Sequence, residues 1–279
     1  MTIKSKYIHL PGTAVVIITA LVASGCTTAP DPTDPDAVTE YRQINDPGEP
    51  TNRKILEINR GIDKAVLEPI AKNYRDHVPQ PLRWRISNFL NNLRAPVIFV
   101  NDVLQGEPDR ALTTATRFVI NSSVGLAGLH DIATEMKLEA HDEDFGQTLA
   151  VWGFGEGPYV MLPVLGPSNP RDTAGLIADI FIDPFGVWLR NTGNINASIG
   201  HKGGETIDYR TENIDLIEDV ENSSLDFYAS IRSLYRQNRI TEINNGLPPA
   251  KFPDMDITQL QDYPGLDTGD YSDEMSFKD

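Results

Sequence analysis

Few residue patterns in this sequence could carry out catalysis. Asp144-Phe145-Gly146 matches the metal-binding tripeptide of protein kinases, and Gly153 and Gly155 resemble part of a glycine-rich phosphate loop. In kinases the glycine-rich loop precedes the tripeptide, and a His-Arg-Asp catalytic loop lies between them. Here the order is reversed, and the sequence has no His-Arg-Asp, Gly-x-Ser-x-Gly or His-Glu-x-x-His motif. We therefore predict that the protein is not an enzyme and has no nucleotide site.

Metal binding is the other chemistry that the side chains could support. His130-Asp131 and the run His141-Asp142-Glu143-Asp144 place imidazole groups next to carboxylates. Neither has the i, i+4 spacing of a helical zinc pair or the ligand ladder of an EF-hand. We interpret the second run as a solvated acidic loop, and we predict no metal and no other cofactor.

Cys26, the only cysteine, has a clearer chemical context. Lys4 and Lys6 form a short basic segment, residues 14–23 are apolar or small, and small residues lead to the cysteine. This layout is typical of a secretory signal peptide, and it is shorter than the roughly 20 apolar residues of a membrane span. It also resembles the lipobox of bacterial lipoproteins, although Ala23 stands where leucine is usual. We predict cleavage before Cys26 and lipidation of its thiol; a cleaved signal that leaves a free thiol is the alternative.

The residue after the cysteine bears on the destination of the protein. Thr27 occupies the position at which an aspartate retains lipoproteins at the inner membrane of enterobacteria. Its presence favours the outer membrane. Two or three acyl chains, at about 0.8 kcal/mol per buried methylene, would make such an anchor effectively permanent.

The charge of the chain argues against nucleic acid as a partner. The formal net charge is −16, and it becomes −18 without residues 1–25, which contain two lysines and no acid. Binding to phosphate backbones or to anionic lipid surfaces depends on clustered lysine and arginine. The composition therefore excludes nucleic-acid binding and electrostatic docking on anionic lipid.

Composition divides the chain into four parts. We predict a signal peptide at residues 1–25, a lipidated tether rich in proline and aspartate at 26–44, a helical domain at 45–245 and an acidic, disordered tail at 246–279. The length of the third part suits one domain. A solubilising role is enough to explain the tail.

The domain is predicted to be mainly helical. Apolar residues recur every three or four positions over residues 55–70, and Pro69 is expected to kink or end that helix. Proline is a good first-turn residue, so further helices are expected to begin at Pro81, at Pro96 and at Pro108.

The second half of the domain has fewer clear signals. Helices are predicted over residues 171–182 and 214–238, and Arg232, Arg236 and Arg239 at the end of the latter suit the helix dipole. Residues 159–165 are the best candidate for a strand, but they contain Pro163, so we interpret them as an extended connection.

Three apolar stretches are interrupted by polar or flexible residues. They cover residues 118–129, 149–165 and 174–189, and none could form an uncharged helix long enough to cross a bilayer. Amphipathic helices in the plane of a membrane interface would explain them, and so would a buried, water-soluble core. In the first case the tryptophans would lie at the level of the lipid headgroups: Trp84, Trp152 and Trp188.

The order of short motifs resembles one known family. The run from Asp46 to Arg53 (DPGEPTNR) resembles the opening of the MlaA (VacJ) lipoproteins, and DFGQTL at residues 144–149 is the densest match. Ile58 is a departure, since many members have phenylalanine there. The positions that carry the resemblance, as structural or pore-related residues, are Asp46, Pro47, Glu49, Asn52, Arg53, Asn59, Asn88, Gln105, Gly106, Arg117, Asn121, Asp144, Phe145, Gly146, Gly157, Pro158, Tyr159, Pro163, Arg171 and Asp172.

This resemblance implies a fold and a function. Members form a single ring-like domain of short amphipathic helices that lies in the periplasmic leaflet of the outer membrane, with a C-terminal periplasmic helix. A central channel lets phospholipids misplaced in the outer leaflet pass to a soluble periplasmic carrier resembling MlaC. Members also bind trimeric porins, so a structural lipoprotein that only scaffolds a porin is the alternative function. Gly153, Gly155 and Gly157 could then form a flexible loop beside the pore, or they could serve tight helix packing.

Overall fold

The computed structural model describes residues 44–193 and 195–246 of the chain. Its elements are α3 (Glu49–Ile62), the π-helix η1 (Asp63–Leu67), α4 (Glu68–His77), α5 (Gln80–Gln105), α6 (Pro108–Ser123), α7 (Ile132–Glu135), α8 (Phe145–Val151), β1 (Val160–Leu162), β2 (Gly166–Ser168), α9 (Pro170–Ile182), α10 (Pro184–Asn191), α11 (Ile195–Glu212), α12 (Ile214–Ser223) and α13 (Phe227–Ile243). The prediction of a mainly helical domain is confirmed. The predicted signal peptide, lipidated Cys26, nearly all of the tether and nearly all of the acidic tail lie outside the described residues.

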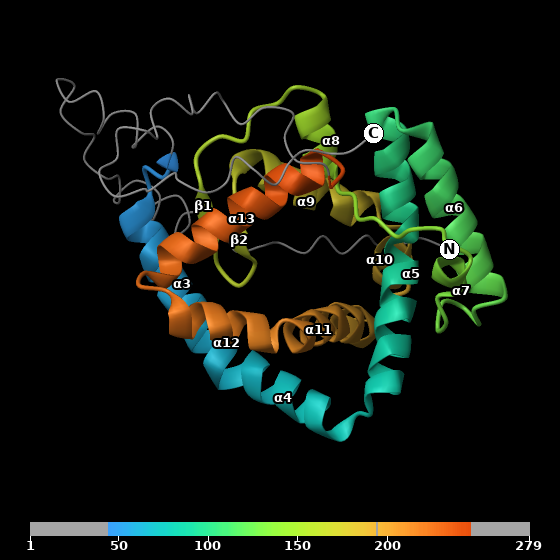
Figure 1. Cartoon of the computed structure of the whole chain (residues 1–279), viewed down its shortest axis with the longest axis horizontal. Helices are drawn as coiled ribbons and strands as arrows, with labels where there is room; N and C mark the ends of the chain where they lie inside the picture. The colour runs from blue at the N-terminus through green and yellow to red at the C-terminus, as the bar shows by residue number, and fades with distance from the viewer. Residues whose placement is uncertain (1–43, 194, 247–279) are drawn as a thin grey trace, which may run out of the picture.

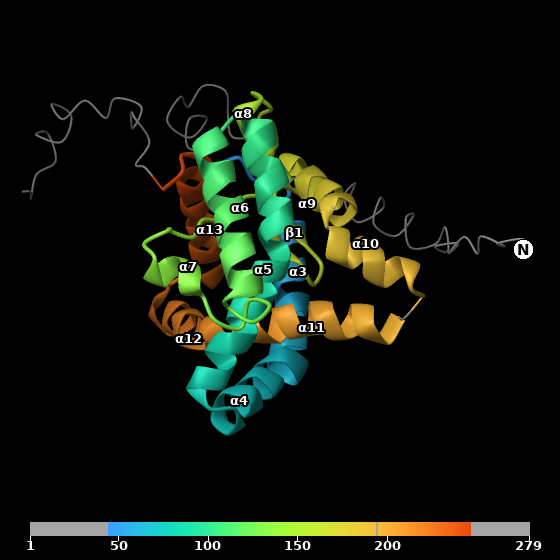
Figure 2. The same ribbon diagram turned by 90° about the vertical axis from the view of Figure 1, so that its right-hand side faces the viewer.

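The helices are arranged as a ring. In Figure 1, α3 and α4 descend along one side, α5 rises along the other, and α8, α9 and α13 close the top. Helices α11 and α12 run across between the two sides. The view in Figure 2 shows α5 and α6 side by side, with the short α7 beside their lower half. The ring-like arrangement expected from the family resemblance is therefore present.

The first long helix changes its winding where the sequence predicts an interruption. The residues of η1 form a π-helix, and α4 begins immediately after it at Glu68. Proline has no backbone N–H, and its ring collides with the carbonyl group four residues earlier. For Pro69 that residue is Ala65, within η1, so the wider π turn accommodates the ring without ending the helix.

The prediction that a separate helix begins at Pro96 is wrong. Pro96 lies inside α5, which runs without a break to Gln105. A proline in a helix interior usually costs about 3 kcal/mol, and this cost must be offset by packing. Helix α5 packs side by side with α6, and its buried residues include Leu90, Ala95 and Val97.

The C-terminal half contains more helix than the sequence signals predict. Helices α10 and α11 were not expected, and the helix predicted over residues 214–238 is two helices, α12 and α13. The break falls at residues 224–226, where Asp226 adopts an extended conformation. Its side chain accepts hydrogen bonds from the backbone N–H groups of Tyr228 and Ala229, as an N-cap residue does.

The predicted extended connection at residues 159–165 is instead one arm of a β-hairpin. Val160 pairs with Ser168 and Leu162 with Gly166, and Pro163 lies in the turn, where it removes no ladder hydrogen bond. The amide of Asn59 donates to the carbonyl oxygen of Leu162 (2.9 Å) and accepts from the N–H of Val164 (2.8 Å).

Asn52, which lies about two helical turns before Asn59, binds the same hairpin. Its Nδ2 donates to the carbonyl oxygen of Tyr159 (3.1 Å), and its Oδ1 accepts from the N–H of Met161 (3.0 Å). Residues seven apart share one helix face, so Asn52 and Asn59 pair with the edge of β1 as a neighbouring strand would. These contacts explain Asn52 and Asn59 of the family signature as structural residues.

We expect Asn52→Ala to lower the free energy of unfolding by about 1–3 kcal/mol, because it leaves buried backbone groups of the hairpin without partners. Urea titration of the mature protein in mild detergent, followed by circular dichroism, measures this change. Asn238→Ala is the matched control, because Asn238 is an exposed helical asparagine on α13 whose side chain donates to Glu242 on the same helix. Equal stability of the two variants would contradict this role of Asn52.

Much of the apolar surface faces outward. Within each of the three interrupted apolar stretches, large side chains are exposed, and Phe181 reaches 75 %. A buried, water-soluble core therefore does not account for most of the large side chains in these stretches, although Tyr159, Met161 and Leu189 are buried. Trp84, Trp152 and Trp188 are also exposed. Among the described residues, no helix is both long and apolar enough to cross a membrane.

Candidate functional site

The interior of the ring is rich in charge. In the described part of the chain, more polar and charged residues than hydrophobic ones are buried. The largest hydrophobic cluster is small and consists of Tyr159, Met161 and Tyr228, with a few partly buried neighbours around it. Buried charge must be paired to be tolerated, so the ion pairs of the interior define how the ring is held together.

One group of ion pairs ties α13 to the start of α3. The carboxylate of Asp46 is fully buried and accepts hydrogen bonds from Asn52 (2.8 Å), Arg232 (2.8 Å) and the hydroxyl of Tyr228. Burial, reinforced by the adjacent Asp46 carboxylate, raises the pKa of Tyr228, which therefore remains a hydrogen-bond donor at all physiological pH values.

Arg53 extends this group toward the N-terminus of α13. Its guanidinium forms a bidentate pair with the cap residue Asp226, with N–O distances of 3.0 and 2.6 Å, and it also bonds Glu49. The Cζ atom of Arg53 lies over the ring of Tyr228, 4.4 Å from the ring centroid. The bond from Arg53 holds the pKa of Asp226 at about 2.

A second group centres on Arg239 near the other end of α13. Its guanidinium donates to both carboxylate oxygens of Asp144 (2.6 and 2.7 Å) and to both of Asp172 (2.9 and 3.1 Å). Tyr235 donates a further hydrogen bond to Asp172 (2.5 Å). Burial by itself would raise the pKa values of both carboxyl groups, but the hydrogen bonds and positive charge of Arg239, joined at Asp172 by the hydrogen bond from Tyr235, outweigh it and lower them.

These contacts correct the explanation of the arginine cluster. Arg232, Arg236 and Arg239 do not serve mainly to complement a helix dipole. Arg236 pairs with Glu156 (2.9 Å), so each of the three arginines binds an acid on a distant segment. Through these ion pairs, the three arginines of α13 connect this helix to the start of α3, to the loop before β1 and to the α8–α9 pair.

Two glycines set the distance between α8 and α9. A Cβ atom on Gly175 would lie 2.2 Å from the backbone nitrogen of Gly146, and one on Gly146 would lie 2.5 Å from the guanidinium of Arg239. Such separations are shorter than any real contact. The glycine of the Asp144-Phe145-Gly146 motif thus serves close helix packing, and Asp144 caps α8 through the N–H of Gln147.

The prediction of a solvated acidic loop at residues 141–144 is wrong for Glu143. Glu143 is 1 % exposed and accepts hydrogen bonds from Gln105 (2.8 Å) and Arg110. Burial raises its pKa despite these partners. Only Asp142 of the run is well exposed, which the sequence could not indicate because the partners of Glu143 come from α5 and α6.

His141, Asp102 and Thr114 lie together but do not form a catalytic triad. The same ring nitrogen, Nε2 of His141, faces both Asp102 (3.0 Å) and the hydroxyl of Thr114 (3.1 Å). In a triad one ring nitrogen contacts the acid and the other contacts the nucleophile. Thr114 moreover donates its proton to Asp102 (2.7 Å), so this arrangement pairs buried polar groups and activates no hydroxyl.

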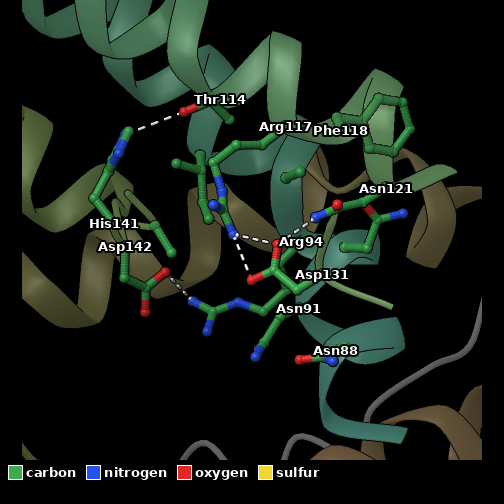
Figure 3. Close-up of a pocket in the computed structure, with 14 residues that line it drawn as sticks. Asn88, Asn91, Arg94, Thr114, Arg117, Phe118, Asn121, Asp131, His141 and Asp142 are labelled. Carbon is green, nitrogen blue, oxygen red and sulfur yellow. Dashed lines mark hydrogen bonds and ion pairs between the residues drawn. The ribbon is translucent and has the colours of Figure 1, made fainter. Parts of the chain in front are cut away.

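A pocket of about 390 Å³ lies beside this cluster, between α5, α6 and the segment that follows α7. Figure 3 shows its lining, in which two arginines each face an aspartate and asparagines line the side formed by α5. The volume falls within the roughly 300–1,000 Å³ of ordinary ligand sites. The polar side chains that line it are Asn88, Asn91, Asn92, Arg94, Thr114, Arg117, Asn121, Asp131, His141 and Asp142.

The glycines at residues 153–157 lie in the loop between α8 and β1. Gly157 has a φ of +74°, and a Cβ there would meet the ring of Pro170 at 3.0 Å, so only this glycine serves close packing. Open space surrounds Gly153 and Gly155 in the described structure. Asn45 and Arg236 hold the second half of the loop, at Gly157 and Glu156. Its role beside a pore stays a prediction.

The structure brings the signature residues together in separate groups. Asn88, Arg117 and Asn121 line the pocket, while Gln105, Gly106 and Phe145 lie at the ends of α5 and α8. The remaining signature residues surround α13, the hairpin or the start of α9: Asp46, Pro47, Glu49, Asn52, Arg53, Asn59, Asp144, Gly146, Gly157, Pro158, Tyr159, Pro163, Arg171 and Asp172. Sequence reasoning missed Arg94, Asp226, Tyr228 and Tyr235, which match no motif.

Fold and site together define a helical protein that buries many charged side chains and exposes many apolar ones. The chain belongs to the MlaA lipoprotein family, whose model matches residues 44–242. It is similar to the intermembrane phospholipid transport system lipoprotein MlaA of Haemophilus influenzae, at 31 % identity over 235 residues that cover 82 % of this chain and 89 % of the relative. Its identity to the protein of the same name from Escherichia coli K12 is 35 % over 226 residues, covering 79 % and 88 %.

A solved structure agrees with this assignment. It was reported under the words "Structural basis for maintenance of bacterial outer membrane lipid asymmetry", and it matches the present fold with a TM-score of 0.63 at 36 % sequence identity. The match covers 71 % of this chain and 99 % of the other. The resemblance based on short motifs is therefore confirmed.

Proposed function

We propose that this protein is an outer-membrane lipoprotein that acts as a passive channel for phospholipids. It removes phospholipids that are misplaced in the outer leaflet and passes them to a soluble periplasmic carrier resembling MlaC, and so maintains lipid asymmetry. Relatives at 31 % and 35 % identity are named as lipoproteins of an intermembrane phospholipid transport system, which supports the substrate class.

The observation that carries the proposal is the inverted distribution of polarity. A headgroup can leave one leaflet only along a path that offers polar partners, because an unpaired polar group in hydrocarbon costs several kcal/mol. Among the described residues, many charged and polar side chains are buried, and many large apolar side chains are exposed. Such a body suits acyl chains around it and headgroups within it.

The protein itself supplies no energy and no catalytic step in this proposal. The sequence has no nucleotide-binding or nucleophile motif, and the Thr114–His141–Asp102 cluster has the wrong geometry for acyl transfer. Net direction would then come from a separate energy-driven complex.

Placement follows from two attachments. The lipid on Cys26, after export and removal of residues 1–25, anchors the chain in the periplasmic leaflet of the outer membrane. The exposed apolar side chains embed the ring in the same leaflet, where a trimeric porin surrounds or flanks it. A structural lipoprotein that only scaffolds the porin is the second candidate, since the exposed apolar faces of α6 and α9 would also suit a protein partner in the membrane.

Deletion of the gene separates these functions. Phospholipid in the outer leaflet, measured on whole cells with an amine reagent that does not cross membranes, should increase and return to normal on complementation. Unchanged surface phospholipid would exclude the channel and favour the scaffold. Lysophospholipid formed on overexpression would instead indicate an enzyme.

We expect Cys26→Ala, exported through an ordinary cleavable signal peptide, to remain mostly with the membrane fraction. Without acyl chains the exposed apolar side chains of the ring still gain about 25 cal/mol per Å² of apolar area on leaving water. Fractionation of cells followed by a carbonate wash measures the distribution, with the lipidated protein as control. Recovery of the variant entirely in the soluble periplasm would show that the ring is not embedded.

A further inference from the structure

The pocket between α5 and α6 contains two ion pairs of different character. Arg117 is largely buried, and its Nη2 contacts both carboxylate oxygens of Asp131 at 2.9 and 3.1 Å. Asp131 also accepts a hydrogen bond from Asn121 (2.9 Å) and caps α7 through the N–H of Thr134. This pair has all its partners within the protein and forms a fixed wall of the pocket.

The other pair has no such support. Arg94 and Asp142 meet through a single contact of 3.1 Å, and their side chains are 46 % and 61 % exposed. Figure 3 shows Arg94 reaching across the pocket from α5 toward Asp142, which lies on the facing segment. Exposed pairs of this kind are weak in water, so each partner is available to another charged group at little cost.

Two amide side chains lie next to this weak pair. Asn88, Asn91 and Arg94 are spaced by three residues on α5, so they are neighbours on one helix face. No hydrogen bond of the Asn88 or Asn91 side chain is formed within the described part of the chain. Both asparagines line the pocket and present free donors and acceptors to it.

The charges of the pocket balance. Arg94 and Arg117 face Asp131 and Asp142, so the lining has no net charge when His141 is neutral. A purely anionic ligand would meet two carboxylates here, whereas a ligand with both a phosphate and an amino group would find a partner for each. Guanidinium and amide N–H groups suit phosphate oxygens, and a carboxylate suits an ammonium group.

We propose that this pocket binds the headgroup of a zwitterionic glycerophospholipid such as phosphatidylethanolamine. The phosphate lies against Arg94 with Asn88 and Asn91, and the amino group replaces Arg94 as the partner of Asp142. The assignment rests on the proposed phospholipid-channel function and specifies a headgroup class for the pocket between α5 and α6.

The test uses the full-length lipidated protein in mild detergent, with dihexanoyl phosphatidylethanolamine and dihexanoyl phosphatidylglycerol as probes. Native mass spectrometry gives the bound fraction of each. The wild-type protein should bind phosphatidylethanolamine roughly tenfold more tightly, the factor that corresponds to one additional charged contact. Asp142→Asn should remove this preference, and Arg94→Gln should weaken the binding of both lipids. Equal affinity of the wild-type protein for the two lipids would overturn the proposal.

Asp215→Asn is the matched control. Asp215 forms an exposed pair with Arg75 at the same 3.1 Å, but far from the pocket, so this variant should keep the wild-type preference. If it loses the preference as Asp142→Asn does, a general charge effect replaces the proposed site. A third probe, glycerophosphoethanolamine without acyl chains, distinguishes the source of the ligand: binding as tight as that of the lipid would assign the pocket to soluble phosphodiesters instead.

Failure of this inference is distinguishable from failure of the proposed function. If gene deletion raises surface phospholipid but the purified protein shows no headgroup preference, the channel stands and the headgroup site does not. If deletion has no effect while the preference is measured, the pocket is a lipid site of a protein that does not transport lipid across the membrane.

Discussion

Arg239→Met is expected to lower the free energy of unfolding by about 3–5 kcal/mol, because it removes the cation that pairs with Asp144 and leaves Asp172 with Arg171 alone. The side chains of Arg239 and Asp172 are 10 % and 9 % exposed, and Asp144 is about one-third exposed. Methionine keeps most of the side-chain volume, so packing loss contributes little. Urea titration of the mature protein in detergent, followed by circular dichroism, measures the change.

The pH dependence identifies the cause of this loss. Arg239 lowers the pKa values of Asp144 and Asp172, so their stabilising contribution is fully present above about pH 4, the unfolded value, and is lost as pH falls through the lowered folded values. In Arg239→Met burial acts without this cation and raises the pKa of Asp144, whereas Asp172 keeps the hydrogen bonds from Arg171 and Tyr235, so its pKa rises less. As pH falls from 7 toward 4, these carboxyl groups become protonated in the folded variant and lose their unpaired charge. The difference in free energy of unfolding between the wild type and the variant should therefore become smaller.

Arg75→Met is the control for removal of an arginine from an ion pair. Arg75 and Asp215 meet at 3.1 Å on the surface, where such pairs contribute about 0–1 kcal/mol. A similar loss in both variants, or a deficit of Arg239→Met that is constant from pH 7 to pH 4, would contradict a role for buried carboxylates.

The sequence predicts the helices where a local signal controls them. The apolar spacing of residues 55–70 correctly predicts a helix there, but Pro69, which is expected to kink or end it, is accommodated by a π turn and the helix continues. The proline at residue 96 has the same local chemistry, yet it lies inside α5 because packing against α6 outweighs it. Local signals cannot distinguish these two prolines, since the difference depends on a helix that follows in the chain.

The charged interior could be predicted only in part. The spacing of Arg232, Arg236 and Arg239 shows that they share one face of a helix, but it does not identify their partners. Arg239 and Asp144 are 95 residues apart, and Arg232 and Asp46 are 186 apart. Only the closed ring brings these residues within hydrogen-bond distance, and so the sequence favoured the weaker explanation by the helix dipole.

The family signature consists largely of residues that close the ring. Asn52 and Asn59 hold the hairpin, while Asp46, Asp144 and Asp172 bind the arginines of α13. A ring whose outside is apolar cannot rely on a large hydrophobic core, so directional polar contacts must replace it. We propose that function depends on fewer signature positions, such as those that line the pocket between α5 and α6.

A substitution at the contact between α8 and α9 is expected to have the second large effect on the free energy of unfolding. Alanine normally stabilises a helix relative to glycine by roughly 0.5–1 kcal/mol, because glycine loses more backbone freedom on folding. At Gly175 we expect the opposite: Gly175→Ala should destabilise the protein by about 1–3 kcal/mol, since its Cβ would lie 2.2 Å from the backbone nitrogen of Gly146. Backbone atoms cannot rotate away as a flexible side chain can, so the two helices must separate. That separation would also move Asp172 and Asp144 relative to Arg239, which couples this contact to the ion pairs described above.

Gly200→Ala supplies the comparison, because Gly200 lies within α11 with open space where a Cβ would be. This variant should be more stable than wild type by roughly 0.5–1 kcal/mol. Opposite signs for two chemically identical substitutions, measured by urea titration under the same conditions, can arise only from the surroundings of each glycine. If both substitutions stabilise the protein, α8 and α9 lie farther apart than in this structure. The contacts between Asp144 and Arg239 would then have to be longer as well.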